Sequence, residues 1–371
     1  MGQVESENPT DSRQLLDRIS SWKGRSLTFM EVCGTHTMAA ARSGLHAVLP
    51  ESIRLISGPG CPVCVTPVGY VDHAIALARI PEVTIATFGD LVRVPGSVDD
   101  GSVSAPPTLA NARAEGADVR VVYSPLDALA LARRDRQRQV VFLGVGFETT
   151  APTLAASILQ AADEGLDNLS LLSAAKTIPE AMEVLASSDE LALDGFLCPG
   201  HVSIILGSDV YRPVAEKYGL ACAIAGFEPV EILQGIAALI DQIENDKARV
   251  DNCYAGAVTK NGNEKARATM YRAFKPSDST WRGIGTIPGS GLDIREAYSQ
   301  HDATRRFDVA VPSPMEPKGC RCGDILRGVI DPTDCGLFGT KCTPDAPRGA
   351  CMVSSEGSCA ARYHYTTGAT S

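Results

Sequence analysis

The chain has 371 residues, of which 44% are hydrophobic and 21% are charged, and its formal net charge is −10. A chain of this length usually folds around more than one hydrophobic core, so two or three domains are expected. The acidic balance, without a basic patch or an aromatic RNA-binding motif, argues against nucleic acid as a partner. No apolar run is long enough to cross a bilayer, so no membrane association is expected.

Short apolar runs alternate with helical segments after a polar N-terminal stretch, residues 1–25, which we expect to be flexible. The expected strands are Leu27–Val32, Ile53–Ile56, Val83–Phe88, Val119–Tyr123, Val140–Val145, Leu169–Leu172, Phe196–Leu197 and Cys222–Ala225. The expected helices are Met38–Val48, Val71–Ala78, Leu126–Arg136, Thr153–Glu164, Pro179–Ser187 and Val230–Ile243, with apolar residues at helical spacing. This alternation predicts βαβ units on largely parallel sheets. We expect two α/β domains, residues 26–115 and 116–311, followed by a small Cys-rich lobe, residues 312–371.

Several expected strands run directly into loops rich in Gly and Pro. These loops carry four side chains suited to proton transfer: Asp90, Glu148, His201 and Glu228. In open parallel sheets the ligand crevice lies at the carboxyl ends of the strands, which predicts a shared cleft. Each residue alone could equally serve only to hold its loop by hydrogen bonds.

The chain has 12 cysteines. The N-terminus has no basic segment followed by an apolar one, so we expect no signal peptide and a cytoplasmic protein. In a reducing cytosol, clustered cysteines indicate metal or redox chemistry rather than structural disulfides.

Six cysteines lie near the C-terminus, with C-x-C and then twelve, six, eight and seven intervening residues. Zinc sites usually use two short C-x₂₋₄-C pairs, which this segment lacks. A [4Fe–4S] cluster accepts varied spacing and is favoured, while zinc or a metal-free disulfide set are the alternatives. The expected cluster ligands are Cys322, Cys335, Cys342 and Cys359, with Cys320 and Cys351 as alternates.

A second group, CGTHT, places Cys33 and His36 in a turn directly after the first strand. At a helix N-terminus the unpaired N–H groups would lower the pKa of the Cys33 thiol. His36 could bind iron, exchange a proton or simply cap the helix.

A third group, GPGCPVC, places Cys61 and Cys64 in a turn after the second strand. Such a pair can form a disulfide, bind a soft metal, or alternate between the two. A thioredoxin-like function is an alternative, although thioredoxin-like proteins are shorter and lack a Cys-rich tail. Because Cys33 follows a neighbouring strand, Cys33, Cys61 and Cys64 together predict one three-thiol site.

These motifs resemble the HypD family of [NiFe]-hydrogenase maturation factors. The resemblance covers residues 26–366 and rests on FMEVCGTHT, SGPGCPVCVTP, FGDLVRVPGS, GFETTAPT, GFLCPGHVS, GFEPVEIL and the Cys-rich tail. It implies two Rossmann-like α/β domains and a C-terminal [4Fe–4S] lobe. It also implies a complex with a HypC-type small chaperone, in which an Fe(II) ion acquires CO and two cyanides, with cyanide supplied by a HypE-type donor.

Carried over to this sequence, the resemblance makes Cys33 an iron-site residue and Cys61 and Cys64 the thiol pair of the same cleft. His36 and His201 are carried over less directly. We therefore expect an assembly scaffold with redox and ligand-transfer chemistry rather than a conventional turnover enzyme. The alternatives are a thiol–disulfide oxidoreductase that uses Cys61 and Cys64 with the cluster as electron source, and a binding module whose metal is purely structural.

Overall fold

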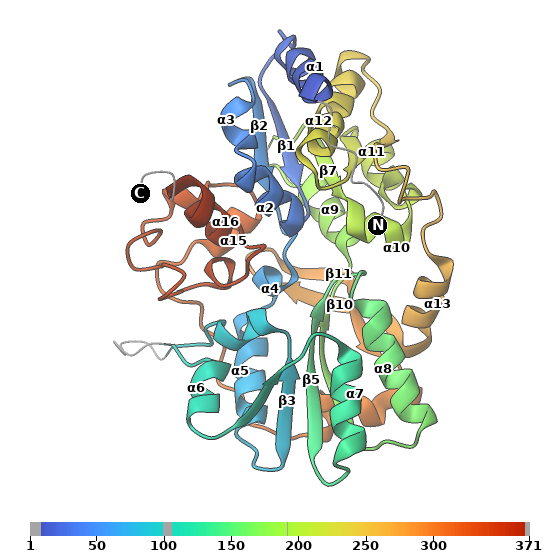
Figure 1. Ribbon diagram of the computed structural model, residues 1–371, viewed down its shortest axis with the longest axis vertical. Helices are drawn as coiled ribbons and strands as arrows, with labels where there is room; N and C mark the ends of the chain where they lie inside the picture. The colour runs from blue at the N-terminus through green and yellow to red at the C-terminus, as the bar shows by residue number, and fades with distance from the viewer. Residues whose placement is uncertain (1–8, 99–105, 191, 368–371) are drawn as a thin grey trace.

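The computed structural model describes residues 9–98, 106–190 and 192–367, and it contains two parallel sheets, one above the other in Figure 1. The five-stranded sheet has the order β2 (Ile53–Ser57), β1 (Leu27–Glu31), β7 (Gly195–Pro199), β8 (Ala221–Ala225) and β9 (Val250–Asn252). The four-stranded sheet has the order β4 (Asp118–Val121), β3 (Val83–Thr87), β5 (Gln139–Gly146) and β6 (Leu169–Ala175). All eight expected strands are present, and the expected α/β class with parallel sheets is confirmed.

The expected boundary near residue 115 does not separate the two sheets. It falls between β3 and β4, which pair with each other in the four-stranded sheet. The chain then returns to the five-stranded sheet, where β7 pairs with β1 in parallel. Each sheet is therefore built from segments far apart in the sequence, because the apolar pattern of a strand does not specify its neighbour.

Helices cover both sheets, as expected for parallel strands that are buried on both faces. Around the five-stranded sheet lie α1 (Pro9–Ser20), α2 (Gly34–Arg42), α3 (Leu45–Val48), α10 (Gly200–Leu206), α11 (Arg212–Tyr218) and α12 (Pro229–Glu244). Around the four-stranded sheet lie α5 (Val68–Ala78), α6 (Leu109–Ala114), α7 (Pro125–Arg134), α8 (Ala151–Asp163), α13 (Glu264–Ala273) and α14 (Ala303–Arg306). Helix α9 (Ile178–Ala186) packs against α11, in the half with the five-stranded sheet. None of the helices in the described segments is long and apolar enough to cross a membrane.

Strand β5 shows how the core is divided. Alternate residues of a strand point to opposite faces of its sheet. Val140 and Phe142 belong to a buried cluster with residues of α7 and α8, whereas Val141 and Leu143 belong to a larger cluster that contains α5. The larger cluster also contains Met30 of β1. It therefore joins the two sheets into one continuous core.

The N-terminal segment differs from the expectation of flexibility. Residues 9–20 form α1, which packs against α12, and Ile19 is fully buried there. Arg18 pairs with the Glu244 carboxylate of α12 at 2.5 Å. The amphipathic pattern of this helix, with Leu15 and Leu16 against α12, explains why it docks. Residues 1–8 lie outside the described part of the chain.

A β-hairpin that the sequence did not indicate lies in the middle of the molecule. It consists of β10 (Phe274–Trp281) and β11 (Gly285–Ile294), which pair antiparallel beside β6. Most β10 side chains between its two buried ends are polar and partly or fully exposed, so the strand lacks an apolar run.

The Cys-rich segment forms a lobe of short helices beside α2, in red in Figure 1. Its helical elements are α15 (Cys322–Leu326), η4 (Pro332–Asp334), η5 (Ala350–Met352) and α16 (Ser358–Arg362). Helix α16 packs against α2, and both α15 and η5 contact α4 (Pro62–Val65), which lies between the lobe and the sheets.

Candidate metal centre

The turn that contains Cys33 lies against the turn that precedes Cys61. The Gly34 N–H donates to the Gly60 carbonyl oxygen at 2.9 Å. A Cβ atom added at Gly60 would lie only 2.2 Å from the backbone nitrogen of Cys33, so glycine alone fits this close approach. The two motifs predicted to cooperate are therefore in direct backbone contact at the carboxyl ends of β1 and β2.

Cys33 is the residue before α2, and its side chain is 8% exposed. Burial raises the pKa of its thiol to about 11, and the Glu356 carboxylate adds to this effect. The N–H groups of His36 and Thr35 oppose the shift, as expected at a helix N-terminus. The expected lowering of the pKa is therefore wrong, because the loss of solvent outweighs the effect of the helix.

His36 and His201 both contact the ring of Phe227, which follows β8. The ring centroids lie 4.9 Å apart for His36 and 4.0 Å apart for His201. His36 is fully buried and its Nε2 lies 2.8 Å from the Gly226 carbonyl oxygen, so Nε2 carries the proton and donates. Nδ1 then holds a lone pair, and it has no partner among the described residues. Burial lowers the pKa of His36 to about 4. His201, by contrast, is exposed.

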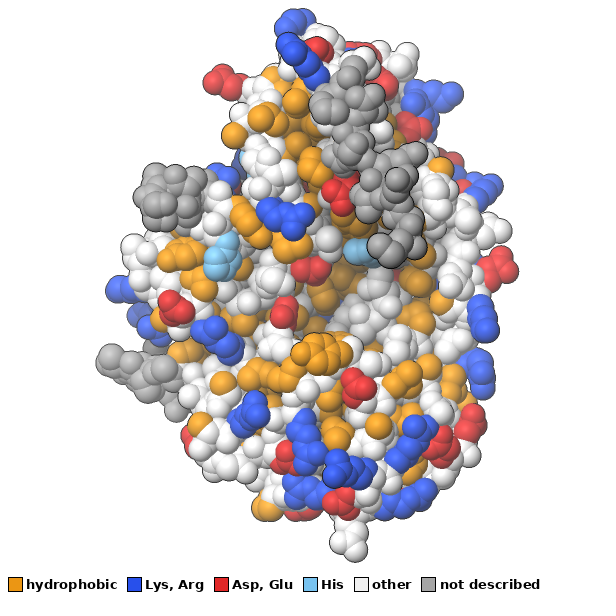
Figure 2. All heavy atoms as spheres, viewed as in Figure 1, with side chains coloured by type: hydrophobic (Ala, Val, Ile, Leu, Met, Phe, Trp, Pro, Cys, Tyr) orange, Lys and Arg blue, Asp and Glu red, His pale blue; other side chains and the backbone are white. Residues whose placement is uncertain are grey.

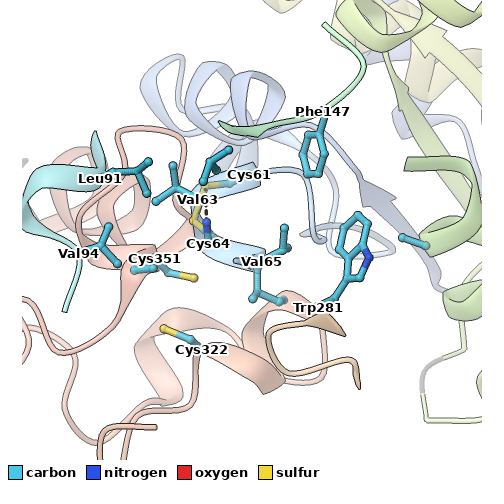
Figure 3. Close-up of a cluster of buried hydrophobic side chains, with 14 of the residues drawn as sticks. Cys61, Val63, Cys64, Val65, Leu91, Val94, Phe147, Trp281, Cys322 and Cys351 are labelled. Atoms are coloured by element: carbon cyan, nitrogen blue, oxygen red, sulfur yellow. Dashed lines mark hydrogen bonds between the residues drawn. A yellow bond between two sulfur atoms is a disulfide. The ribbon is translucent and has the colours of Figure 1, made fainter. Parts of the chain in front are cut away.

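Cys61 and Cys64 are joined by a disulfide. Cys61 precedes α4, and its Sγ accepts the Cys64 N–H at 3.2 Å. Both cysteines are buried. Figure 3 shows Cys322 and Cys351 of the lobe in the same buried cluster as this pair. The structure thus contains the oxidised form of the predicted thiol pair, next to the Cys-rich lobe.

The loop of the β-hairpin holds the other end of α4. The Arg282 N–H donates to the Val65 carbonyl at 2.8 Å, and its Nε donates to the Thr66 carbonyl at 3.0 Å. Arg282 is 4% exposed and pairs with Glu316 at 3.5 Å. Its positive charge also acts on Cys320. The hairpin therefore fixes the disulfide turn and places a buried cation beside the lobe.

A small apolar cavity inside the lobe is lined by several cysteines. Its walls are formed by Cys320, Cys322, Ile325, Cys335, Leu337, Phe338, Cys342, Met352 and Cys359. The Sγ atoms of Cys320 and Cys322 lie 3.3 Å apart, and the Arg348 N–H donates to Cys342 Sγ at 3.3 Å. All four expected cluster ligands thus line one cavity, together with Cys320. Cys351, the second alternate, lies outside this lining.

Three thiols of this cavity, those of Cys320, Cys342 and Cys359, have raised pKa values and are therefore disfavoured as anions. The pKa of Cys359 is raised by its contact with Cys322 and by burial, and burial raises the pKa of Cys342. Several thiolates in a closed apolar space require a compensating positive charge, which an iron–sulfur cluster supplies. The donor set therefore fits such a cluster. No group of three His, Cys, Asp or Glu in the described segments is arranged to hold a single metal ion.

Two polar contacts tie the lobe to the other turns. Thr35 donates to Glu356 at 2.8 Å, and Ser354 donates to Asp90 at 2.9 Å. Asp90, expected near the cleft, thus holds the lobe. Glu228 is exposed and caps α12, which is the alternative that the sequence left open for it.

Two carboxylates near Cys33 were not anticipated from the sequence. Glu31, at the end of β1, is fully buried, and neither carboxylate oxygen has a hydrogen bond of normal geometry within the described chain. Burial raises its pKa to about 8. A carboxylate inside the apolar run LTFMEV was the available signal for Glu31. Glu356 gave no such signal, because its contact with Thr35 spans 321 positions of the chain.

An α/β fold that gathers a buried thiol, a disulfide and a cavity lined by cysteines is typical of proteins that handle metal centres. The comparisons with known proteins define the family. The family model HypD, described as the hydrogenase formation hypA family, matches residues 10–366. The chain therefore belongs to the HypD family of hydrogenase maturation factors.

Curated relatives agree with this assignment over nearly the full chain. The chain is 48% identical to the hydrogenase maturation factor HypD of Azotobacter vinelandii, covering 95% of this chain and 94% of the relative. It is 48% identical to the hydrogenase expression/formation protein HupD of Azotobacter chroococcum, with the same coverage. It is 42% identical to HypD of Escherichia coli, covering 95% of this chain and 93% of the relative.

Proposed function

We propose that this chain, in the cytoplasm, holds the iron on which the Fe(CN)₂CO group of a [NiFe]-hydrogenase is assembled. It does so together with a HypC-type small chaperone and receives cyanide from a HypE-type donor. The observation that carries the proposal is the backbone contact between the Cys33 turn and the Gly60–Cys61 turn. This contact brings two thiol motifs to one sheet edge, in the family that the comparisons define.

The sulfurs of Cys33, Cys61 and Cys64 are the proposed iron donors, although in the described segments they are not arranged around a metal ion and two of them are joined in a disulfide. A low-spin Fe(II) with CO and cyanide favours soft, electron-rich ligands, and thiolates are such ligands. The disulfide must first accept two electrons, which breaks the S–S bond, and the two sulfurs then bind as thiolates or take up two protons. His36 and His201 would serve this site through their contacts around Phe227.

The lobe is proposed to hold the [4Fe–4S] cluster through Cys322, Cys335, Cys342 and Cys359, which line its cavity. When bound, such a cluster supplies electrons one at a time. Cys320 and Cys351 remain the alternates. Cys351 lies beside α4 rather than in the cavity, which favours a place for it near the disulfide.

Infrared spectroscopy tests the proposal directly. The chain is purified without oxygen, together with its small chaperone, and the region of metal-bound CO and cyanide is recorded. We expect bands from the wild type and from the control Cys253→Ala, whose cysteine lies after β9, and no bands from Cys33→Ala. Wild-type protein without such bands, or a Cys33→Ala variant that retains them, would contradict the proposal.

The buried disulfide also favours a second function, that of a thiol–disulfide oxidoreductase using Cys61 and Cys64. The same Cys33→Ala variant distinguishes the two. It should stop hydrogenase maturation under the first proposal. Under the second, it should leave the reduction of a small disulfide substrate by the reduced Cys61/Cys64 pair unchanged, while Cys61→Ala stops it.

A further inference from the structure

A cavity of about 390 Å³ lies where the two halves of the molecule meet, away from the disulfide. One wall comes from the end of β5 and the start of α9, and contains Glu148, Thr177 and Glu180. The other comes from the end of α10, the segment at residues 209–210 and α13. Helices α10 and α13 contact each other and both lie toward the right of Figure 1. Cavities between two halves of a fold are common ligand sites.

The first wall carries three buried polar atoms that have no partner among the described residues. They are Glu148 Oε2, Thr177 Oγ1 and Glu180 Oε2. Glu148 is fully buried and Thr177 is 5% exposed. The other Glu148 oxygen accepts the Ile178 N–H at 2.9 Å, which fixes the carboxyl group in place. Buried polar atoms are rarely left unpaired, so three on one wall indicate a missing group.

The opposite wall is different, because none of its described residues has a buried polar side-chain atom without a hydrogen-bond partner. Lys260 Nζ lies 4.0 Å from the Asp209 carboxylate, and an Arg267 N–H donates to the Leu206 carbonyl at 3.5 Å. The buried polar atoms of the cavity that lack a hydrogen-bond partner therefore belong to the two carboxyl groups and the hydroxyl of the first wall. A group with several N–H donors satisfies these atoms best.

We propose that this cavity binds a small organic cation, whose ammonium or guanidinium group contacts Glu148, Thr177 and Glu180. Its volume suits a molecule of about amino-acid size. The space-filling view shows the molecule hollowed across the middle of one face, between its upper and lower halves (Figure 2). This site does not depend on iron, on the cluster or on a partner protein.

Protonation gives the site a distinctive signature. Burial raises the pKa of Glu148 to about 8, and the Glu180 carboxylate adds to this effect. Glu148 is therefore mostly neutral at pH 7, and a bound cation would release its proton. The other titratable groups that line the cavity are Glu180, Asp209, Lys260, Arg267 and Tyr271. Tyr271 has a pKa raised by burial and stays neutral at this pH.

Isothermal titration of the full chain with agmatine, which carries both a guanidinium and an ammonium group, tests the site. At pH 7 we expect binding with release of close to one proton, measured by repeating the titration in buffers of different ionisation enthalpy. Glu148→Gln should abolish the proton release and weaken binding at least tenfold. Glu180→Gln should weaken binding similarly but keep the proton release.

The matched control is Glu183→Gln on the same helix, whose carboxylate pairs with Lys217 outside the cavity and should leave binding unchanged. Urea unfolding verifies that each variant is folded. Glutarate, an anion of similar length, should not bind. The inference is overturned if agmatine does not bind folded wild type, if Glu148→Gln and Glu180→Gln bind as wild type does, or if glutarate or Mg²⁺ binds with the same dependence on Glu148. None of these results bears on the infrared test of the iron site.

Discussion

Replacing Gly60 by alanine tests whether the two thiol turns must touch. The added Cβ would lie 2.2 Å from the Cys33 nitrogen and 2.5 Å from its Cα. Real Cβ atoms keep at least 3.0 Å from such neighbours, so one turn must move by about 0.8 Å or more. Both partners are backbone atoms, which cannot relieve the clash by rotating a side chain.

The cost follows from two terms. Forcing an extra carbon into a closely filled site costs about 1–3 kcal/mol. The movement also breaks the hydrogen bond from the Gly34 N–H to the Gly60 carbonyl, and leaving its buried groups unpaired costs about 1–3 kcal/mol more. We therefore expect Gly60→Ala to lower the free energy of unfolding by about 2–6 kcal/mol and to stop maturation of hydrogenase in a strain that lacks its own copy.

Urea unfolding of purified protein measures the first effect, and hydrogenase activity in the complemented strain measures the second. Gly256→Ala is the matched control, because a Cβ there meets nothing within 4 Å. It should change stability by no more than about 0.5 kcal/mol. The reasoning is refuted if Gly60→Ala is as stable as Gly256→Ala and supports maturation equally well.

Three further predictions address the separate parts of the site. Cys342→Ala should lose the iron and sulfide of the cluster, whereas Cys351→Ala should retain them, as measured by iron and sulfide per chain; equal loss in both would contradict the cavity assignment. Alkylation of Cys33, followed by mass spectrometry, should rise about tenfold per pH unit from pH 8 to pH 10 because the pKa of the thiol is about 11; a plateau near pH 8 would show an activated thiolate. The pKa of His36 is about 4 in the folded state and about 6.5 in the unfolded state. Between these two pH values the unfolded state binds more protons than the folded state. The free energy of unfolding should therefore fall by up to about 3 kcal/mol as the pH decreases from 6.5 to 4. His36→Gln should remove this part of the slope, and identical pH profiles of unfolding would disprove it.

Much of the fold could be predicted because buried parallel strands are short apolar runs with Gly or Pro after them. Runs such as Ile53–Ile56 and Val140–Val145 could be recognised as strands without knowing which strands they pair with. The order in which strands pair depends on contacts between distant segments, and the expected boundary at residue 115 therefore fell inside one sheet. Strand β10 was missed for the opposite reason: its side chains are mostly polar, and it is held by pairing with β11.

The site was predictable where a local motif sets the chemistry, and less so where burial decides it. The motif at Cys33 correctly placed the thiol at the start of α2. It did not indicate that the lobe closes over this turn and raises the pKa of the thiol. Similarly, His36 lies in a recognisable motif, but its lone pair and its contact with Phe227 depend on the end of β8.

The lobe and the Cys33 turn are also coupled through their own close contact. A Cβ at Gly34 would lie 2.5 Å from Glu356 Cβ, so the lobe fits only against a glycine at this point. Gly349 has the same role inside the lobe, where a Cβ would lie 2.5 Å from Cys322 Sγ. A small lobe with few long elements would depend for its rigidity on the cluster that we propose for it. Glu356 and Thr35 join that lobe to α2. A change that disorders the cysteine cavity should therefore also expose Cys33 to solvent.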